Sequence, residues 1–139
     1  MTNYYFDMDG VLANFHKEKY SYANASNREW IANLEPFIEN VNIVKDLIHN
    51  GNKVYILSKA ATEQAKEGKI DWLKKYIPEI AIENIIVIVG NGKKVDYIQT
   101  NDGILVDDDI KNVRPWRKGG YKAILLETKG EKIDITKAA

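Results

Sequence analysis

The stretch YYFDMDGVLANF, residues 4–15, begins as an apolar run and then places two aspartates, Asp7 and Asp9, one residue apart and directly before Gly10. Residues at i and i+2 of an extended chain lie on one side of the backbone, so the two carboxylates can act together. Gly10 can adopt dihedral angles closed to other residues and lets the chain turn at once. The pair is therefore either ordinary turn chemistry or the start of a metal and phosphate site, and the rest of the sequence must distinguish the two.

Four more short apolar runs follow without alternating polar residues. They are KVYIL (53–57), IIVIV (85–89), GILV (103–106) and KAILL (122–126). Continuous apolar runs of this length are typical of strands buried on both faces, as in a parallel sheet covered by helices.

Helices are expected between these runs, because apolar residues recur there at helical spacing between a capping residue and a helix breaker. The expected bounds are Asn40 as N-cap to Asn50-Gly51, Thr62 as N-cap to Pro78, and a start near Asn112, with Pro115 in the first turn, to Gly119-Gly120. Strand and helix alternating in this way predict an α/β doubly wound fold, a three-layer parallel sheet, in a single domain of residues 1–139.

Residues 14–39 do not fit this alternation, because they contain no strand-like run. The sequence SNRE at 26–29 matches a capping box with Ser26 as the cap, which predicts a short helix that ends at Pro36. We expect this segment to be a small helical insert, a cap over the carboxyl edge of the sheet.

Polar residues follow four of the five apolar runs. They are Asp7 and Asp9, then Ser58 and Lys59, then Lys93 and Lys94, and finally Asp107, Asp108 and Asp109. Ligands of doubly wound sheets bind outside the carboxyl ends of the strands, so these side chains are expected to share a crevice. Carboxylates suit a hard cation such as Mg²⁺, and a hydroxyl and ammonium groups suit a phosphoryl group. Asp109 alone is expected to be a structural acid at a helix start.

These motifs resemble, in order, those of the haloacid dehalogenase (HAD) superfamily of phosphohydrolases. DMDGVLANF is similar to its first motif, Ser58 in YILSKA to the second, Lys94 in GKKVDYI to the third, and the acidic pair in ILVDDD to the fourth. Within the superfamily, FDMDGVLANF and LVDDDIKNVRPWRKGGYKAILL are most similar to the 5′(3′)-deoxyribonucleotidase group. The resemblance spans nearly the whole chain and implies a Rossmann-like core.

The resemblance implies that Asp7 is a nucleophile that forms an aspartyl-phosphate. Asp9 would protonate the leaving oxygen, then activate water, and give its backbone carbonyl to Mg²⁺. Asp108 would bind Mg²⁺ directly, together with Asp7, and Asp107 would be a second ligand or a positioning group. His16 is not expected to act as a base, because the acid pair supplies that chemistry.

The resemblance also assigns the phosphate-binding groups. Ser58 and Lys94 would hold the phosphoryl oxygens. Lys59 is not part of the family motif, but its place beside Ser58 at the end of the second run makes it a further candidate for binding the anion. Lys93 is the alternative to Lys94.

The chain departs from the deoxyribonucleotidase pattern at Asn14, where that group often has aspartate, and at Lys59, where it commonly has proline. The insert of residues 14–39 is roughly half the size of the cap of that group. A small cap favours a more open site, or one that a partner subunit completes. The aromatic residues of the insert are expected to form mainly its core, with Trp30 and Tyr22 the best candidates for stacking on a ligand.

Composition excludes several other classes. The chain has no cysteine, which excludes disulfides and thiolate chemistry. Its 20 basic and 20 acidic residues balance, so it lacks the strong positive potential of a protein that coats nucleic acid. No signal peptide and no membrane span are evident, so a cytoplasmic protein is expected, either a monomer or a homodimer.

The expected function is Mg²⁺-dependent, 5′-nucleotidase-like hydrolysis of a phosphomonoester, namely a deoxyribonucleoside monophosphate or another small phosphorylated metabolite. Two alternatives stay open. One is a receiver-like module that accepts a phosphoryl group, and the other is a non-catalytic binding module of the same fold.

Overall fold

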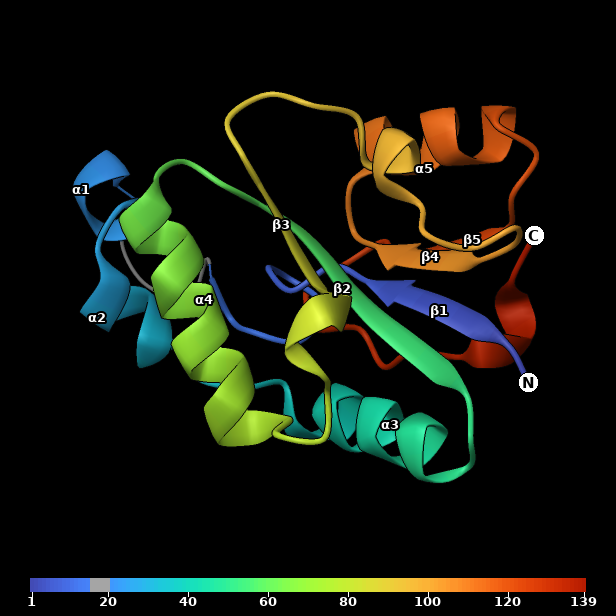
Figure 1. The fold of residues 1–139 in the computed structure, drawn as a ribbon, viewed down its shortest axis with the longest axis horizontal. Coiled ribbons are helices and arrows are strands. Elements are labelled where there is room, and N and C mark those ends of the chain that lie inside the picture. The colour runs from blue at the N-terminus through green and yellow to red at the C-terminus, as the bar shows by residue number, and fades with distance from the viewer. Residues whose placement is uncertain (16–20) are drawn as a thin grey trace.

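The computed structural model describes residues 1–15 and 21–139, and the expectations for His16 and the Tyr22 side chain lie outside this part. Five parallel strands form one sheet in the order β3-β2-β1-β4-β5 (Figure 1). The strands are β1 (Asn3–Phe6), β2 (Lys53–Ala60), β3 (Ile85–Val89), β4 (Ile104–Asp107) and β5 (Ala123–Leu125). The doubly wound fold class is confirmed, and β2 and β4 extend far enough to include Ser58, Lys59 and Asp107.

Helices cover both faces of the sheet. The helices of the described residues are α1 (Tyr22–Ala25), α2 (Arg28–Ala32), α3 (Ile38–His49), α4 (Glu63–Tyr76) and α5 (Ile110–Lys118). Short 3₁₀ turns are η1 (Ile82–Asn84), η2 (Lys94–Tyr97) and η3 (Ile135–Lys137). Helices α3 and α4 lie on one face, and α5 with η2 lies on the other (Figure 1). None of the helices within the described ranges is long and apolar enough to cross a membrane.

Strand β1 shows why the buried runs do not alternate in polarity. Tyr4 and Phe6 belong to the core on the α3 and α4 side, whereas Tyr5 belongs to the core on the α5 side. The Tyr5 ring stacks on Tyr55 at a centroid distance of 4.6 Å and contacts Trp116 at 5.2 Å. Because side chains alternate along a strand, a strand covered on both faces must be apolar at every position.

The strand order reverses between β1 and β4. The chain first builds the sheet outward through β2 and β3 and then returns to add β4 and β5 on the other side of β1. A crevice forms at such a switch point, outside the carboxyl ends of the two strands. The order also differs from the 2-1-3-4-5 order of receiver domains, which removes the receiver-like alternative.

Two of the expected helix starts are wrong. Helix α3 begins at Ile38, and Asn40 lies inside it, buried, with its side chain hydrogen-bonded to distant backbone groups. Helix α5 begins at Ile110 because Asp109 caps it by accepting a 2.9 Å hydrogen bond from the backbone N–H of Lys111. Asp109 is thus a structural acid as expected, and Pro115 lies mid-helix rather than in the first turn.

The expected cap at Thr62 is confirmed, since its hydroxyl accepts a 3.1 Å hydrogen bond from the N–H of Ala65. In the insert, however, the cap of α2 is Asn27 rather than Ser26, because the Asn27 carbonyl oxygen accepts from the N–H of Trp30 at 2.9 Å. The helix also ends earlier than expected, at Ala32.

Helix α2 is fixed to α4. Arg28 pairs with Asp71 at 2.7 Å and with Glu67 at 2.6 Å. The two helices approach closely at Gly68, where a Cβ would meet the backbone carbonyl of Arg28. Trp30 packs edge-on against Phe15 at 5.4 Å, which joins α2 to the turn that follows β1.

Candidate active site

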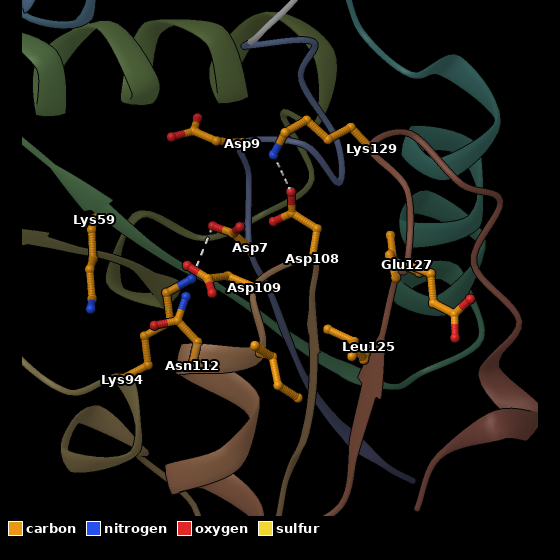
Figure 2. A pocket seen from close by; sticks show the side chains of 12 residues that line it. Asp7, Asp9, Lys59, Lys94, Asp108, Asp109, Asn112, Leu125, Glu127 and Lys129 are labelled. Atoms are coloured by element: carbon orange, nitrogen blue, oxygen red, sulfur yellow. Dashed lines mark hydrogen bonds and ion pairs between the residues drawn. The ribbon is translucent and has the colours of Figure 1, made fainter.

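A cleft of about 590 Å³ opens at the switch point (Figure 2). Its walls come from the turns after β1, β4 and β5, from the end of β2, and from η2 and the start of α5. The lining residues are Asp7, Asp9, Lys59, Lys94, Asp108, Asp109, Ile110, Asn112, Leu125, Leu126, Glu127 and Lys129. This volume lies within the range usual for pockets that hold small molecules.

Asp7 lies at the floor of the cleft, and the backbone holds it there. Its N–H donates to the carbonyl of Val106 in β4 at 2.9 Å, so the residue continues the sheet ladder. One carboxylate oxygen, Oδ1, accepts from the N–H of Met8 at 2.9 Å and lies 3.0 Å from Lys94 Nζ. The carboxylate is thus oriented before any ligand arrives.

Lys94 joins Asp7 to Asp107. The residue is only 3% exposed, and its Nζ lies 2.7 Å from Asp107 Oδ2. Burial alone lowers the pKa of Lys94, but the carboxylates of Asp7 and Asp107 outweigh it and raise that pKa well above its ordinary value. Burial and the nearby Asp7 charge raise the pKa of Asp107 to about 7, against the opposing effect of Lys94.

Asp107 has hydrogen bonds at both oxygens. Oδ1 accepts from the N–H of Asp109 at 2.9 Å, and Oδ2 accepts from Lys94 and, at 3.2 Å, from the Asn112 amide. The residue is fully buried. It therefore forms the base of the site beneath the cleft wall.

Asp108 faces the cleft and completes a cluster of three carboxylates. Single oxygens of Asp7, Asp107 and Asp108 lie within 4.8 Å of one another. Burial, opposed by Lys129, raises the pKa of Asp108. Lys129 approaches from the loop after β5 and lies 2.7 Å from Asp108 Oδ2 (Figure 2). Three hard oxygen donors at this spacing suit Mg²⁺.

Asp9 points away from Asp7 and Asp108 (Figure 2). Its Oδ2 lies 2.7 Å from Nζ of Lys69, a buried residue of α4. Burial, and then the Asp7 charge, raise the pKa of Asp9 above its ordinary value despite the opposing Lys69. Ser58 lies behind Asp9, fully buried, and its hydroxyl accepts from Lys69 at 2.7 Å.

The structure brings together most of the residues expected from the sequence. Asp7, Asp9, Lys59, Lys94 and Asp108 line the cleft. Asp107 and Ser58 lie behind its walls, fully buried. Lys93 is exposed and does not line the cleft, so the geometry favours Lys94 over Lys93.

Three side chains that contact the carboxylates of the site lie outside the expected set: Lys69, Asn112 and Lys129. Lys69 has a signal in the sequence, because it lies in helical register with Ala65, Trp72 and Leu73 on the buried stripe of α4. A lysine on such a stripe needs a buried partner. Lys129 follows the fifth apolar run, at the same edge of the sheet as the other strand ends.

Gly10 makes room for this arrangement. It has a φ of +79°, and a Cβ there would collide with the Asp108 carboxylate. Its carbonyl accepts a 2.8 Å hydrogen bond from the N–H of Gly130, which ties the turn after β1 to the loop that carries Lys129.

Comparisons with known proteins agree with this fold. Solved structures include a similar fold, the HAD domain of the effector protein Lem4 from Legionella pneumophila, with a TM-score of 0.56 and 19% identity over 94% of this chain and 88% of that one. No curated protein matches the chain. Residues 16–137 match the family described as 5′ nucleotidase, deoxy (Pyrimidine), cytosolic type C protein. Because this match covers most of the sequence, the chain belongs to that family of HAD-type phosphohydrolases.

Proposed function

We propose that the protein is a Mg²⁺-dependent phosphomonoester hydrolase that acts through an aspartyl-phosphate on Asp7. The observation that carries the proposal is the oriented Asp7 carboxylate, which lies beside a buried lysine and within 4.8 Å of two further carboxylates. Family membership supports the reaction class.

Two displacements at phosphorus make up the proposed reaction. A carboxylate oxygen of Asp7 attacks phosphorus, the bond to the ester oxygen breaks, and Asp9 gives its proton to that oxygen. Water then attacks the aspartyl-phosphate, Asp9 takes the water proton, and inorganic phosphate leaves with Asp7 restored. The raised pKa of Asp9 supports the acid role, since the group must be protonated for the first step.

Lys94 and Lys59 would hold the phosphoryl group. An ammonium has three N–H donors, and Lys94 directs two of them at Asp7 and Asp107, which leaves one for a phosphoryl oxygen. Lys59 is exposed on the cleft wall and supplies a second positive charge. Ser58 would contribute its hydroxyl hydrogen from behind Asp9.

Mg²⁺ would bind to Asp7, Asp108 and the backbone carbonyl of Asp9. Asp108 is favoured over Asp107 as the direct ligand, because Asp107 is fully buried with both oxygens hydrogen-bonded, whereas Asp108 faces the cleft. Asp107 would position Lys94. When bound, the cation would neutralise the charge of the phosphoryl oxygens.

A deoxyribonucleoside monophosphate is the proposed substrate, and the family supports this class. We infer that residues 14–39 act as a cap within a single domain. A second cavity of about 210 Å³ supports this inference, because Phe15 and Ala25 of the insert line it together with Asp9 and Lys69. The leaving group would lie there, beside the acid that protonates it.

Phosphate release from p-nitrophenyl phosphate tests the reaction. We expect Mg²⁺-dependent turnover that EDTA abolishes and that Asp7→Asn reduces by at least about 10³-fold, since the nucleophile is lost. Asp46→Asn, on the exposed face of α3, should behave as wild type. Equal rates for wild type and Asp7→Asn would refute the mechanism.

A panel of nucleoside monophosphates, deoxynucleoside monophosphates and sugar phosphates tests the substrate. We expect the highest kcat/KM with deoxyribonucleoside monophosphates. Activity on sugar phosphates alone would reject the nucleotide assignment while leaving the phosphatase chemistry intact, and no activity on any ester would favour the binding-module alternative.

A further inference from the structure

Lys69 is a buried lysine of α4 that contacts both Asp9 and Ser58. Its side chain is 2% exposed, and its Nζ lies 2.7 Å from Asp9 Oδ2, 2.7 Å from Ser58 Oγ and 2.6 Å from the carbonyl oxygen of Lys59. These three acceptors match the three N–H donors of an ammonium. Lys69 therefore has no donor left for a phosphoryl oxygen, and any contribution to the reaction must pass through its partners.

The contact with Asp9 distinguishes the two oxygens of that carboxyl group. Oδ2 is bound to the ammonium, whereas Oδ1 is buried and has no hydrogen-bond partner among the described residues. Because Lys69 holds Oδ2, it fixes the direction of the whole Asp9 carboxyl group.

The contact with Ser58 determines where the hydrogen of the Ser58 hydroxyl points. An ammonium cannot accept a hydrogen bond, so the Ser58 oxygen is the acceptor, and its own hydrogen must point elsewhere. Lys69 thereby makes Ser58 available as a donor. Phe15 covers the ammonium from the insert side, with its ring centroid 5.9 Å from Nζ, which helps to keep water from replacing these contacts.

We propose that Lys69 is a positioning residue whose ammonium binds Asp9 through Oδ2, fixes the direction of that carboxyl group for proton transfer to the leaving oxygen, and simultaneously orients the Ser58 hydroxyl. This inference rests on the proposed function, in which Asp9 is the general acid. It adds a residue of α4 to the site.

The dependence of the rate on the leaving group tests the proposal. An alkoxide leaving group needs a proton in the transition state, whereas p-nitrophenolate is weakly basic and needs little help. The experiment compares kcat/KM for benzyl phosphate and p-nitrophenyl phosphate in wild type, Lys69→Met and Asp9→Asn. We expect Lys69→Met to lose about 10²-fold on benzyl phosphate and less than about 10-fold on p-nitrophenyl phosphate, within the range of general-acid contributions.

Two further variants separate positioning from folding. Lys74→Met, on the exposed face of the same helix, should match wild type on both esters. In the ratio of benzyl phosphate to p-nitrophenyl phosphate activity, the double variant Lys69→Met/Asp9→Asn should lose little more than Asp9→Asn alone, because both substitutions remove proton donation by Asp9. Loss of the oriented Ser58 hydroxyl would instead lower the activity on both esters alike. Equal losses on the two esters in Lys69→Met, or an additive loss of the ratio between the two esters in the double variant, would overturn the proposal.

Lys69→Gln provides a second test if Lys69→Met does not fold, since its amide can still donate to Asp9 and Ser58. We expect a smaller loss of the same kind, larger for benzyl phosphate than for p-nitrophenyl phosphate. Failure of both variants to fold, checked by thermal melting, would assign Lys69 to stability alone and refute the positioning role. Activity that survives Asp7→Asn would instead refute the proposed function itself.

Discussion

Lys129 and Asp108 meet at 2.7 Å, at the carboxylate that the proposed cation needs. The Asp108 side chain is 9% exposed and that of Lys129 is 48% exposed, so the lysine can leave toward solvent while the aspartate cannot. The pair therefore competes with cation binding, and its strength is that of a partly exposed ion pair.

We predict that Lys129→Met strengthens Mg²⁺ binding. Removing the competing ammonium should lower the Kd for Mg²⁺ roughly 1.4- to 5-fold, because such pairs contribute about 0.2–1 kcal/mol. Isothermal titration of Mg²⁺ into substrate-free protein measures the change. Lys132→Met is the matched control, since Lys132 lies in the same loop region and pairs only distantly, at 3.9 Å, with Glu39. Weaker binding in Lys129→Met would contradict the prediction.

Gly10→Ala should damage the site as well as the backbone. The φ of +79° makes a side chain unfavourable, and the new Cβ would collide with Asp108. We expect a loss of about 1–3 kcal/mol in the free energy of unfolding, together with at least about 10-fold lower turnover.

Gly51→Ala separates the two effects. Gly51 also has a positive φ, +86°, but nothing lies within 4 Å of its Cβ position, so it carries the backbone strain alone. Denaturant unfolding and phosphate release on both variants make the comparison. Equal turnover in the two variants would show that Asp108 tolerates displacement.

At the residue scale, the sequence identifies side chains by type and position but not by their partners. Asp7, Asp9 and the acidic pair could be predicted because strand ends converge at one edge of a parallel sheet. Lys69 and Lys129 could not be predicted with equal ease, because each reaches the site from a helix or loop whose position depends on tertiary packing.

Strands and helices also differ in how well the sequence predicts them. Apolar runs located every strand, since burial on both faces leaves a clear pattern. Helix starts were less predictable, because a residue type that often caps helices can instead form hydrogen bonds elsewhere in the fold. Asn40 illustrates this, as it lies inside α3 with its amide used to join loops rather than to cap the helix.

Asn40 of α3 holds two loops that border the site. Its Nδ2 donates to the carbonyls of Val11 and Glu131, each at 2.9 Å, and its Oδ1 accepts from the N–H of Ile133 at 3.0 Å. One buried side chain thus joins α3, the turn after Asp9 and the loop that carries Lys129.

We predict that Asn40→Ala lowers the free energy of unfolding by about 3 kcal/mol, because buried backbone groups lose their partners. Turnover should also fall, since both loops border the cleft. Asn42→Ala, on the exposed face of the same helix, is the control and should change stability by less than about 0.5 kcal/mol. Denaturant unfolding measures both. A loss below 1 kcal/mol, on the order of a single exposed contact, would disprove the supporting role of Asn40.

At the scale of the whole molecule, the acidic centre opposes folding when no cation is bound. Burial raises the pKa values of Asp9, Asp107 and Asp108, and that of Asp107 reaches about 7. In the unfolded chain, aspartate titrates near pH 3.9, about its ordinary value. Between these two pKa values the folded state binds more protons than the unfolded state, so the free energy of unfolding falls as pH rises.

We predict that the Tm of the protein in EDTA falls by several degrees from pH 5 to pH 7.5, since about 1 kcal/mol corresponds to roughly 4 °C in a chain of this size. Asp107→Asn should flatten this slope, and Asp96→Asn, an exposed acid of η2, should not. Saturating Mg²⁺ should raise Tm most at the higher pH, because the cation binds only the folded, ionised cluster. A Tm that rises with pH in EDTA would contradict the prediction.

The reversal of strand order at β1 and β4 has one more consequence. The acid pair, Ser58 and Lys69 precede Gly90, whereas Lys94, Asp107, Asp108 and Lys129 all follow it. Gly90 begins an open turn after β3, with nothing near its Cβ position. A chain divided there would yield two pieces, one with the nucleophile and one with its cationic partner, which meet only when β1 pairs with β4. Catalysis by the pair of pieces would then serve as a reporter for their reassembly.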